Sequence, residues 1–267
     1  MGTSARNIKN GWLHPSGSAL ILRAVNLIII HPNELCGDRV ELSDERARHV
    51  RKVLKAEVGK ALRVGLLNGP LGTGTVEAIH GNEVALTCVF ETVVPPRPRI
   101  DLVLAMPRPK VLKRMWAQLA ALGVGRIVLL RADKVERFYF DSHVVEPEFY
   151  ERLLIEGLQQ ARCTRLPEVI IRPLFKPFVE DELEGMFAGE RKLLADPAGE
   201  KRLSELFHEG AVAERVVLAV GPEGGWTPYE VAMLMDRGFE VFGAGERILR
   251  TDTATIALLA LLSEHGA

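Results

Sequence analysis

The sequence has few cysteines and no long apolar run. Cys36, Cys88 and Cys163 are its three cysteines, and no two of them form a C-x-x-C pair. This spacing excludes a disulfide framework, so we expect reduced, structural thiols and no metal site. No apolar stretch reaches the length of a membrane span, because Arg23 and Asn26 interrupt the first one. We therefore expect a cytoplasmic protein without a membrane partner.

The chain also lacks an excess of charge of either sign. Its 34 Lys and Arg residues nearly balance 35 Asp and Glu residues, which gives a formal net charge of -1. There is thus no global attraction to nucleic acid, and any RNA binding must come from local basic faces. With 267 residues, 47% of them hydrophobic, the chain is long and apolar enough for two domains with real cores.

Residues 25–94 predict a small first domain made of short strands. Asn26 to Ile30 is expected to form one strand, and Ser43 or Asp44 can cap the basic helix that follows. Three later segments alternate or are β-branched, with glycine-containing turns between them: Leu62 to Leu66, Gly74 to Ile79 and Val84 to Phe90. The spacing indicates a small antiparallel barrel. The PPRPR segment, residues 95–99, reads as a stiff linker.

Residues 100–267 predict an α/β domain with a parallel sheet. The expected strands are Ile100 to Ala105, Arg126 to Leu130, Lys192 to Ala195, Val216 to Val220 and Phe239 to Phe242. The expected helices are Val111 to Leu122, Phe149 to Cys163 and Thr253 to Leu262. In the KVERFYF segment we favour a strand with Phe138 and Phe140 on its core face over a platform that stacks an unpaired base.

Two glycine-bearing loops follow the last two of these strands. GPEGG, residues 221–225, comes after Val220, and then Thr227, Pro228 and Glu230 supply the capping box and first position of a helix. Gly238 is expected to end that helix in a left-handed conformation. GAGERIL, residues 243–249, comes after Phe242. Ligands of open α/β sheets bind at the carboxyl ends of strands, so the two loops predict a shared ligand site.

Common nucleotide motifs do not fit these loops. GPEGGW lacks the Lys-Ser/Thr of a P-loop, and GAGERI has Ile248 where a dinucleotide fingerprint needs its third glycine. A phosphate cradle is therefore disfavoured, and a dehydrogenase is a distant alternative. Taken alone, GPEGG reads as an ordinary turn.

GPEGGWT together with GERILRTDTA resembles the SPOUT-class methyltransferases that methylate N3 of a uridine in bacterial 16S ribosomal RNA. The resemblance extends to ALGVGRIVLL, to Glu156, Gln159 and Arg162 in an E-x-x-Q-x-x-R pattern, and covers nearly all of residues 26–262. It implies a PUA-like β-barrel domain, a SPOUT domain with a trefoil knot, S-adenosyl-L-methionine as cofactor, and a homodimer. Family members begin near Asn26, so residues 1–24 are expected to be a disordered leader or a mis-assigned start before Val25.

The resemblance also implies roles for individual residues. The cofactor is expected to contact Leu194, Ala195, Gly221, Pro222, Glu223, Gly224, Gly225, Gly243, Gly245, Arg247, Ile248, Leu249 and Thr251. Arg250, Asp252 and Glu223 are the catalytic candidates, because a carboxylate can take the N3 proton while an arginine stabilises the oxyanion. RNA contacts are expected at Arg46, Arg48, His49, Arg51, Lys52, Arg114, Gln159 and Arg162.

Alternatives remain open for several of these residues. Asp252 could cap the last helix, since the family more often has Glu there, and Glu223 could stabilise its loop. Trp226 could line the donor pocket or be buried beneath the helix start. The basic segment around Arg46 to Lys55 could be a solvated face. At the level of function, the alternatives are a methyltransferase of this class that acts on another RNA base, and a non-catalytic RNA-binding or ribosome-assembly protein.

Overall fold

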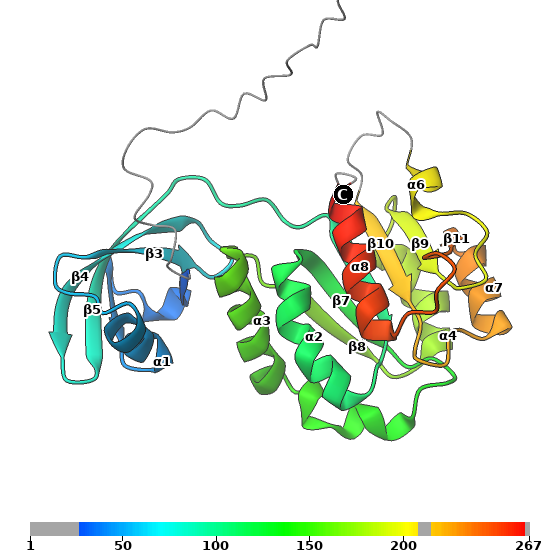
Figure 1. Ribbon diagram of the computed structural model, residues 1–267, viewed down its shortest axis with the longest axis horizontal. Helices are drawn as coiled ribbons and strands as arrows, with labels where there is room; N and C mark the ends of the chain where they lie inside the picture. The colour runs from blue at the N-terminus through cyan, green and yellow to red at the C-terminus, as the bar shows by residue number, and fades with distance from the viewer. Residues whose placement is uncertain (1–26, 208–214, 265–267) are drawn as a thin grey trace, which may run out of the picture.

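The computed structural model describes residues 27–207 and 215–264, which form two sheets, each with its own hydrophobic core (Figure 1). The expectations for residues 1–24 lie outside the described residues. The first sheet contains β1 (Ile28–Ile30), β2 (Arg39–Leu42), β3 (Ala61–Leu66), β4 (Leu71–His80) and β5 (Glu83–Phe90). Its strand order is β1-β3-β4-β5-β2.

The first sheet is mixed, which corrects the expectation of a purely antiparallel arrangement. β1 pairs parallel with β3, because some thirty residues containing β2 and a helical segment carry the chain across between them. The β3–β4, β4–β5 and β5–β2 pairs are antiparallel as expected. A glycine-containing turn joins β4 to β5, as expected, and its Gly81 has a φ of 55°. β2 was not predicted, although its side chains alternate between exposed and buried.

The expected basic helix is present as α1 (Glu45–Arg48), which runs into a π-helical turn, η3 (His49–Val53). Of the two predicted caps the structure has Asp44, whose carboxylate accepts a hydrogen bond from the Arg46 backbone N–H at 2.9 Å. A short 3-10 turn, η2 (Pro32–Glu34), follows β1. Ala47 and Val50 turn inward and join the first core.

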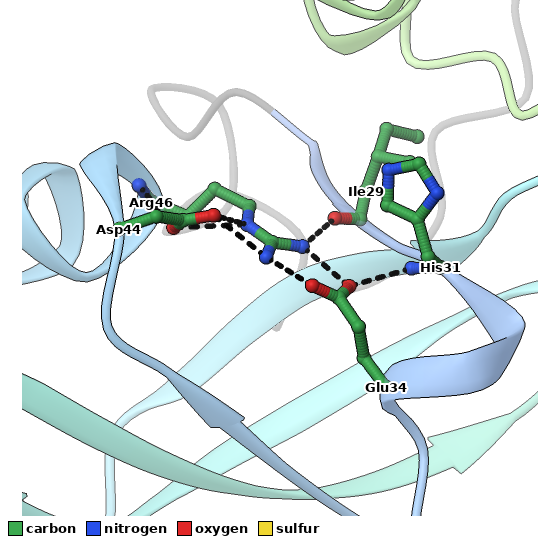
Figure 2. A network of polar contacts seen from close by, with 5 residues as sticks. All are labelled: Ile29, His31, Glu34, Asp44 and Arg46. Carbon is green, nitrogen blue, oxygen red and sulfur yellow. Dashed lines mark hydrogen bonds and ion pairs between the residues drawn. The ribbon is translucent and has the colours of Figure 1, made fainter.

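Arg46 lies inside this unit and ties three of its segments together (Figure 2). Its guanidinium donates to Asp44 from Nε at 2.9 Å, and to Glu34 and the Ile29 carbonyl from Nη1 at 2.8 and 2.9 Å. Glu34 also accepts from the His31 backbone N–H at 2.8 Å. Only 17% of the Arg46 side chain is exposed, so it is not part of the exposed basic face on which the sequence had placed it.

The Glu34–Arg46 pair predicts an acid-dependent loss of stability. The hydrogen bond from Arg46, opposed by burial, lowers the pKa of Glu34 below its ordinary value of 4.5. A carboxyl with a lowered folded-state pKa stabilises the fold above the unfolded value, and this stabilisation is lost as pH falls through the folded value. Glu34→Gln is therefore expected to cost roughly 1–3 kcal/mol near pH 7 and progressively less below about pH 4.5. Urea unfolding at pH 7 and pH 3.5 tests this, and an equal cost at both pH values would contradict it.

The second sheet is entirely parallel, as predicted. Its strand order is β11-β9-β10-β6-β7-β8. The strands are β6 (Ile100–Ala105), β7 (Val124–Leu130), β8 (Glu168–Arg172), β9 (Arg191–Ala195), β10 (Val216–Val220) and β11 (Phe239–Phe242). The central β6 and β10 are buried along their whole length, as near-continuous apolar strands in a parallel sheet should be. β8, an edge strand, was not predicted.

Helices cover this sheet. Neighbouring helices α3, α2 and α8 lie in front of it in Figure 1, and α7 packs against β11. The main helices are α2 (Pro109–Ala121), α3 (Pro147–Ala161), α7 (Pro228–Asp236) and α8 (Thr251–Glu264). Shorter turns are η4 (Arg137–Asp141), η5 (His143–Val145), α4 (Phe175–Pro177), η6 (Phe178–Glu182), α5 (Leu183–Met186) and α6 (Leu203–Leu206).

The KVERFYF segment corrects a prediction. Its second half lies in the 3-10 helix η4 and the segment contains no strand, while Phe138 is 63% exposed instead of facing the core. Phe140 is partly buried against the second core. Alternation of aromatic and polar residues over so few positions fits both a strand and an irregular turn, so the period could not distinguish them.

The segment after α3 joins the two sheets. α3 ends at Ala161, and its C-cap residue Arg162 adopts a left-handed conformation with a φ of 56°. The buried Thr164 then donates its hydroxyl to the Gly69 carbonyl at 2.6 Å, and its own carbonyl accepts from the Asn68 N–H at 2.7 Å. Arg165 donates to the carbonyls of Pro95 and Asn68. The PPRPR segment is thus hydrogen-bonded to the second unit through the carbonyls of Pro95, Pro98 and Arg99.

Two further expectations concern the cysteines and membrane-spanning helices. Cys88 is buried, and this burial, with a contribution from Asp38, raises the pKa of its thiol to about 11. Cys36 is exposed, contrary to a structural role for all three thiols. Among residues 27–207 and 215–264, no helix is long and apolar enough to cross a membrane.

Candidate functional site

The two glycine-bearing loops leave the sheet side by side. Ala195 at the end of β9 pairs with Val220 on one side and with Phe242 on the other. Since all three strands are parallel, their exits meet at one edge of the sheet. The loop after β9, the GPEGG loop after β10 and the GAGERIL loop after β11 therefore converge, as the sequence predicted.

A cavity of about 480 Å³ opens between these loops, and we call it the donor cavity. Its volume lies within the range of small-molecule sites. Eleven of the expected cofactor residues line it: Ala195, Gly221, Pro222, Glu223, Gly224, Gly225, Gly245, Arg247, Ile248, Leu249 and Thr251. The remaining lining residues are Asp196, Pro197, Val220, Trp226, Ala244, Glu246, Ala254 and Leu258.

Two expected cofactor residues do not line the cavity. Leu194 is fully buried in β9, one residue before the strand exit, where it joins the second core. Gly243 instead lies against the loop after β9: a Cβ on it would meet the Gly199 carbonyl oxygen at 2.5 Å. Its N–H donates to the Lys201 carbonyl at 2.9 Å. Gly243 thus serves a close crossing of two backbone segments.

The GPEGG loop is a tight turn held from outside. Gly225 has a φ of 68°, and its N–H donates to the Pro222 carbonyl at 2.9 Å. A Cβ on Gly221 would meet the indole of Trp226 at 3.0 Å. Lys134 reaches across from the loop after β7 and donates to the Gly224 carbonyl at 2.7 Å. The loop therefore keeps its shape through contacts that leave its backbone facing the cavity.

Glu230 fastens the helix start below this loop. Its carboxylate accepts hydrogen bonds from the Thr227 N–H at 2.8 Å and from the Asp133 N–H at 2.7 Å. The Glu230 N–H in turn donates to the Thr227 hydroxyl oxygen at 3.3 Å. The residue is 2% exposed. The predicted capping box is confirmed, and it also links α7 to the loop after β7, which the sequence did not reveal.

The three catalytic candidates lie in two places. Glu223 lines the donor cavity and accepts from the Arg108 N–H at the start of α2, at 3.3 Å. Asp252 lies in the first turn of α8, with Arg114 Nη2 at 3.3 Å and Arg250 Nε at 3.6 Å. Its carboxylate also accepts from the Thr253 N–H at 3.0 Å. Asp252 therefore combines a contact at the helix terminus with a position between two arginines.

Trp226 fulfils both of its sequence interpretations, since it is 6% exposed and also lines the cavity. Asp196 and Pro197 line the cavity because they directly follow β9. Lys134 was not singled out, because its contact with Gly224 joins segments that are 90 residues apart. No local pattern marks such a contact.

The expected RNA-binding residues lie on α1 and η3 of the first unit, and on α2, on α3 or directly after α3 in the second. Arg48 pairs with Glu45 at 2.8 Å, and Arg51 donates to Asn82 at 2.7 Å. Arg48, His49 and Lys52 share a second cavity with Gln159 of α3. Arg114 lies instead beside Asp252. The structure thus separates a basic region on the first unit from Arg114 on the second, which pairs with Asp252.

Comparison with known proteins assigns a family. Residues 95–263 match the model of the RNA methyltransferase domain. The chain belongs to this family. Among curated relatives of this RNA methyltransferase is ribosomal RNA small subunit methyltransferase E of Treponema pallidum, 29% identical over 248 residues that cover 89% of this chain and 90% of the relative. Another is ribosomal RNA small subunit methyltransferase E 1 of Borreliella burgdorferi. It is 28% identical over 236 residues, which cover 87% of this chain and 95% of the relative.

Solved structures share the fold of this RNA methyltransferase. A ribosomal RNA small subunit methyltransferase E from Neisseria gonorrhoeae, solved with S-adenosyl methionine bound, superposes with a TM-score of 0.73 at 20% identity and covers 90% of this chain and 97% of that one. A rRNA-methyltransferase from Porphyromonas gingivalis, described as probable, has a TM-score of 0.73 at 22% identity, with coverage of 91% and 98%.

Proposed function

We propose that this protein transfers a methyl group from S-adenosyl-L-methionine to N3 of a uridine in 16S ribosomal RNA. The observation that carries the proposal is the donor cavity, formed by three converging strand exits in a chain of the RNA methyltransferase family. The relatives from Treponema and Borreliella are named as methyltransferases of small-subunit ribosomal RNA, and this supports the proposed RNA substrate.

The residues of the cavity fit this cofactor. Val220, Trp226 and Leu258 offer apolar surface for an adenine ring, and the loop backbones can approach closely at Gly221, Gly224 and Gly225. Three carboxylates, from Asp196, Glu223 and Glu246, suit a ligand that carries a sulfonium and an ammonium. The cofactor supplies an activated methyl group, so the protein has mainly to orient it against the acceptor.

Asp252 and Arg250 are placed to prepare the acceptor. Uridine N3 is a weak nucleophile while it carries its proton, so a carboxylate that accepts this proton accelerates the transfer. Asp252 lies between Arg114, at 3.3 Å, and Arg250, at 3.6 Å. Arg250 is 72% exposed on its side chain and free to contact the uracil oxygen on which charge develops. Glu223, hydrogen-bonded to Arg108, holds its loop against α2.

Mass spectrometry of 16S ribosomal RNA tests the proposal. RNA from a strain that lacks the gene is incubated with the protein and methyl-labelled S-adenosyl-L-methionine, and one N3-methyluridine is expected to appear. Label in another base would assign a different target. RNA binding without donor binding in calorimetry would support a non-catalytic assembly protein and refute the proposal.

The basic segment of residues 45–55 is proposed to contact the RNA backbone. Arg51→Ala together with Lys52→Ala is expected to weaken RNA binding and to reduce the slope of log affinity against log salt by up to about 2, because each phosphate contact contributes roughly one unit. Filter binding at several salt concentrations measures this. Lys176→Ala, which removes an exposed charge paired with Glu180 on the second unit, is the control. An unaltered slope in the double variant removes this segment from the RNA site.

We also propose the larger organisation that the resemblance implies. Residues 25–94 form a PUA-like barrel domain, residues 95–99 the linker, and residues 100–267 the SPOUT domain. A trefoil knot is supported by the path from the edge strand β11 past Lys201 and Arg202 to α8, which packs on β10 and β6. A homodimer is supported by exposed Ile248 and Leu261, and sedimentation velocity tests it. The proposed substrate places the protein in the cytoplasm.

A further inference from the structure

A second cavity of about 480 Å³ lies between the two structural units and shares no lining residue with the donor cavity. We call it the junction cavity. It is lined by Leu27, Ile28, Glu45, Arg46, Arg48, His49, Lys52, Val53 and Gln159. Eight of these residues belong to the first unit, whereas Gln159 belongs to α3, which packs against α2 of the second. At this junction the Leu27 N–H also donates to the Gln159 carbonyl at 3.2 Å.

The walls of the junction cavity combine apolar surface with positive charge. Leu27, Ile28 and Val53 provide the apolar part. Within the described part of the chain, Arg48 is held only by an exposed pair with Glu45, and such surface pairs contribute little. Lys52 forms no hydrogen bond or ion pair with any residue in the described ranges. Both cations are therefore available to an anionic ligand.

Arg46 forms a fixed part of the cavity wall. Its guanidinium is held by Glu34, Asp44 and the Ile29 carbonyl, as Figure 2 shows, so it has no donor left to exchange for a ligand. The bonds to β1 and η2 keep the start of α1 at a set place. Arg48, His49 and Lys52 are thereby presented to the cavity from a rigid support.

The imidazole of His49 is the polar group whose unmet hydrogen-bonding capacity indicates a ligand. Its Nε2 is buried and has no hydrogen-bond partner among the described residues. A buried polar atom without a partner destabilises a fold, so such an atom in a cavity wall is a candidate ligand contact. Gln159 lines the same cavity, and its side-chain amide offers both a donor and an acceptor, the pair that suits the edge of a nucleic-acid base.

We propose that the junction cavity takes one unpaired nucleotide of the RNA whose target uridine enters the donor cavity. The base packs on the apolar wall and is read by His49 and Gln159, while its phosphates lie near Arg48 and Lys52. Because residues of both units line the cavity, the bound nucleotide sets the distance along the RNA from this anchor to the methylated base. The inference rests on the proposed function and adds a specificity-determining site to it.

Two substitutions test the proposal through the affinity for 16S ribosomal RNA, measured by filter binding at one salt concentration. Gln159→Leu keeps the approximate shape of the side chain and removes its hydrogen bonds. Gln118→Leu, the same change at an exposed position of α2, is the matched control. We expect about tenfold weaker RNA binding for Gln159→Leu and wild-type binding for Gln118→Leu. Equal affinities for the two variants would overturn the proposal.

His49→Phe separates ligand binding from folding. It removes the nitrogen that lacks a partner, so thermal stability should be retained or increased while RNA affinity falls about tenfold. Lower stability with unchanged RNA affinity would show that His49 is structural and would overturn its role. Methylation by the wild type, measured in parallel, reports on the proposed function by itself. If it fails, the binding comparison still tests the junction cavity.

Soaking crystals with the four nucleoside 5′-monophosphates identifies the preferred base. Density between Val53 and Gln159, with the phosphate near Lys52, is the expected result. Nucleotide found only in the donor cavity would contradict a second nucleotide site.

Discussion

Gly243→Val is expected to weaken binding of S-adenosyl-L-methionine by about 10- to 100-fold, although Gly243 does not line the donor cavity. A Cβ at this position would meet the Gly199 carbonyl oxygen at 2.5 Å, and a backbone atom cannot rotate away as a side chain can. The segment after β11, which forms one wall of the cavity, must therefore shift. Overpacking of this kind costs about 1–3 kcal/mol. Isothermal titration calorimetry measures the loss.

Gly185→Val is the control for this variant. A Cβ on Gly185 would meet nothing within 4 Å, so the same substitution there should leave donor affinity unchanged. A thermal unfolding scan of both variants checks that the two cores remain folded. Normal donor affinity in folded Gly243→Val would show that the crossing at Gly199 does not shape the cavity.

Asp252→Asn is expected to lower kcat by about 100- to 10,000-fold, with little change in the KM for either substrate. The amide keeps the size of the side chain and its acceptor for the Thr253 N–H, but it cannot take the N3 proton. Because N3 loses its proton unaided at higher pH, the activity of the variant should rise with pH more steeply than that of the wild type. Single-turnover methylation across a pH series measures both effects.

Glu223→Gln is the matched comparison, since it makes the same change in the other candidate carboxylate. Its amide oxygen can still accept from the Arg108 N–H, so kcat should fall by no more than about tenfold. The reverse order, with Glu223→Gln the more damaging, would exchange the roles proposed for the two residues. Full activity of Asp252→Asn would leave Asp252 as a helix-terminal residue only.

The sequence predicted the second sheet well because its strands are short, apolar and followed by recognisable turns. β6, β10 and β11 have the predicted bounds, and Thr227, Glu230 and Gly238 perform the predicted roles at the ends of α7. Helix caps and apolar strands can be recognised from a few neighbouring residues in the sequence. The donor loops could therefore be placed together before the structure was known.

The features that were missed depend on contacts between distant segments. Gly243 lies against Gly199 and Lys134 against Gly224, and no period or motif in the chain reports such pairs. Arg46 reads as one more basic residue on a helix, yet two carboxylates and a carbonyl enclose it. η4 was predicted as a strand because a few alternating residues do not define a period. The junction cavity could not be predicted because it also depends on distant segments: Gln159 lies more than 100 positions from His49.

A crystal structure of the protein soaked with S-adenosyl-L-methionine tests the central claim most directly. The account predicts that the cofactor lies between residues 221–226 and 244–251, with its sulfonium on the side of Asp252 and its adenine against Val220, Trp226 and Leu258. Cofactor bound at any other place, or an empty donor cavity at saturating cofactor, would contradict it.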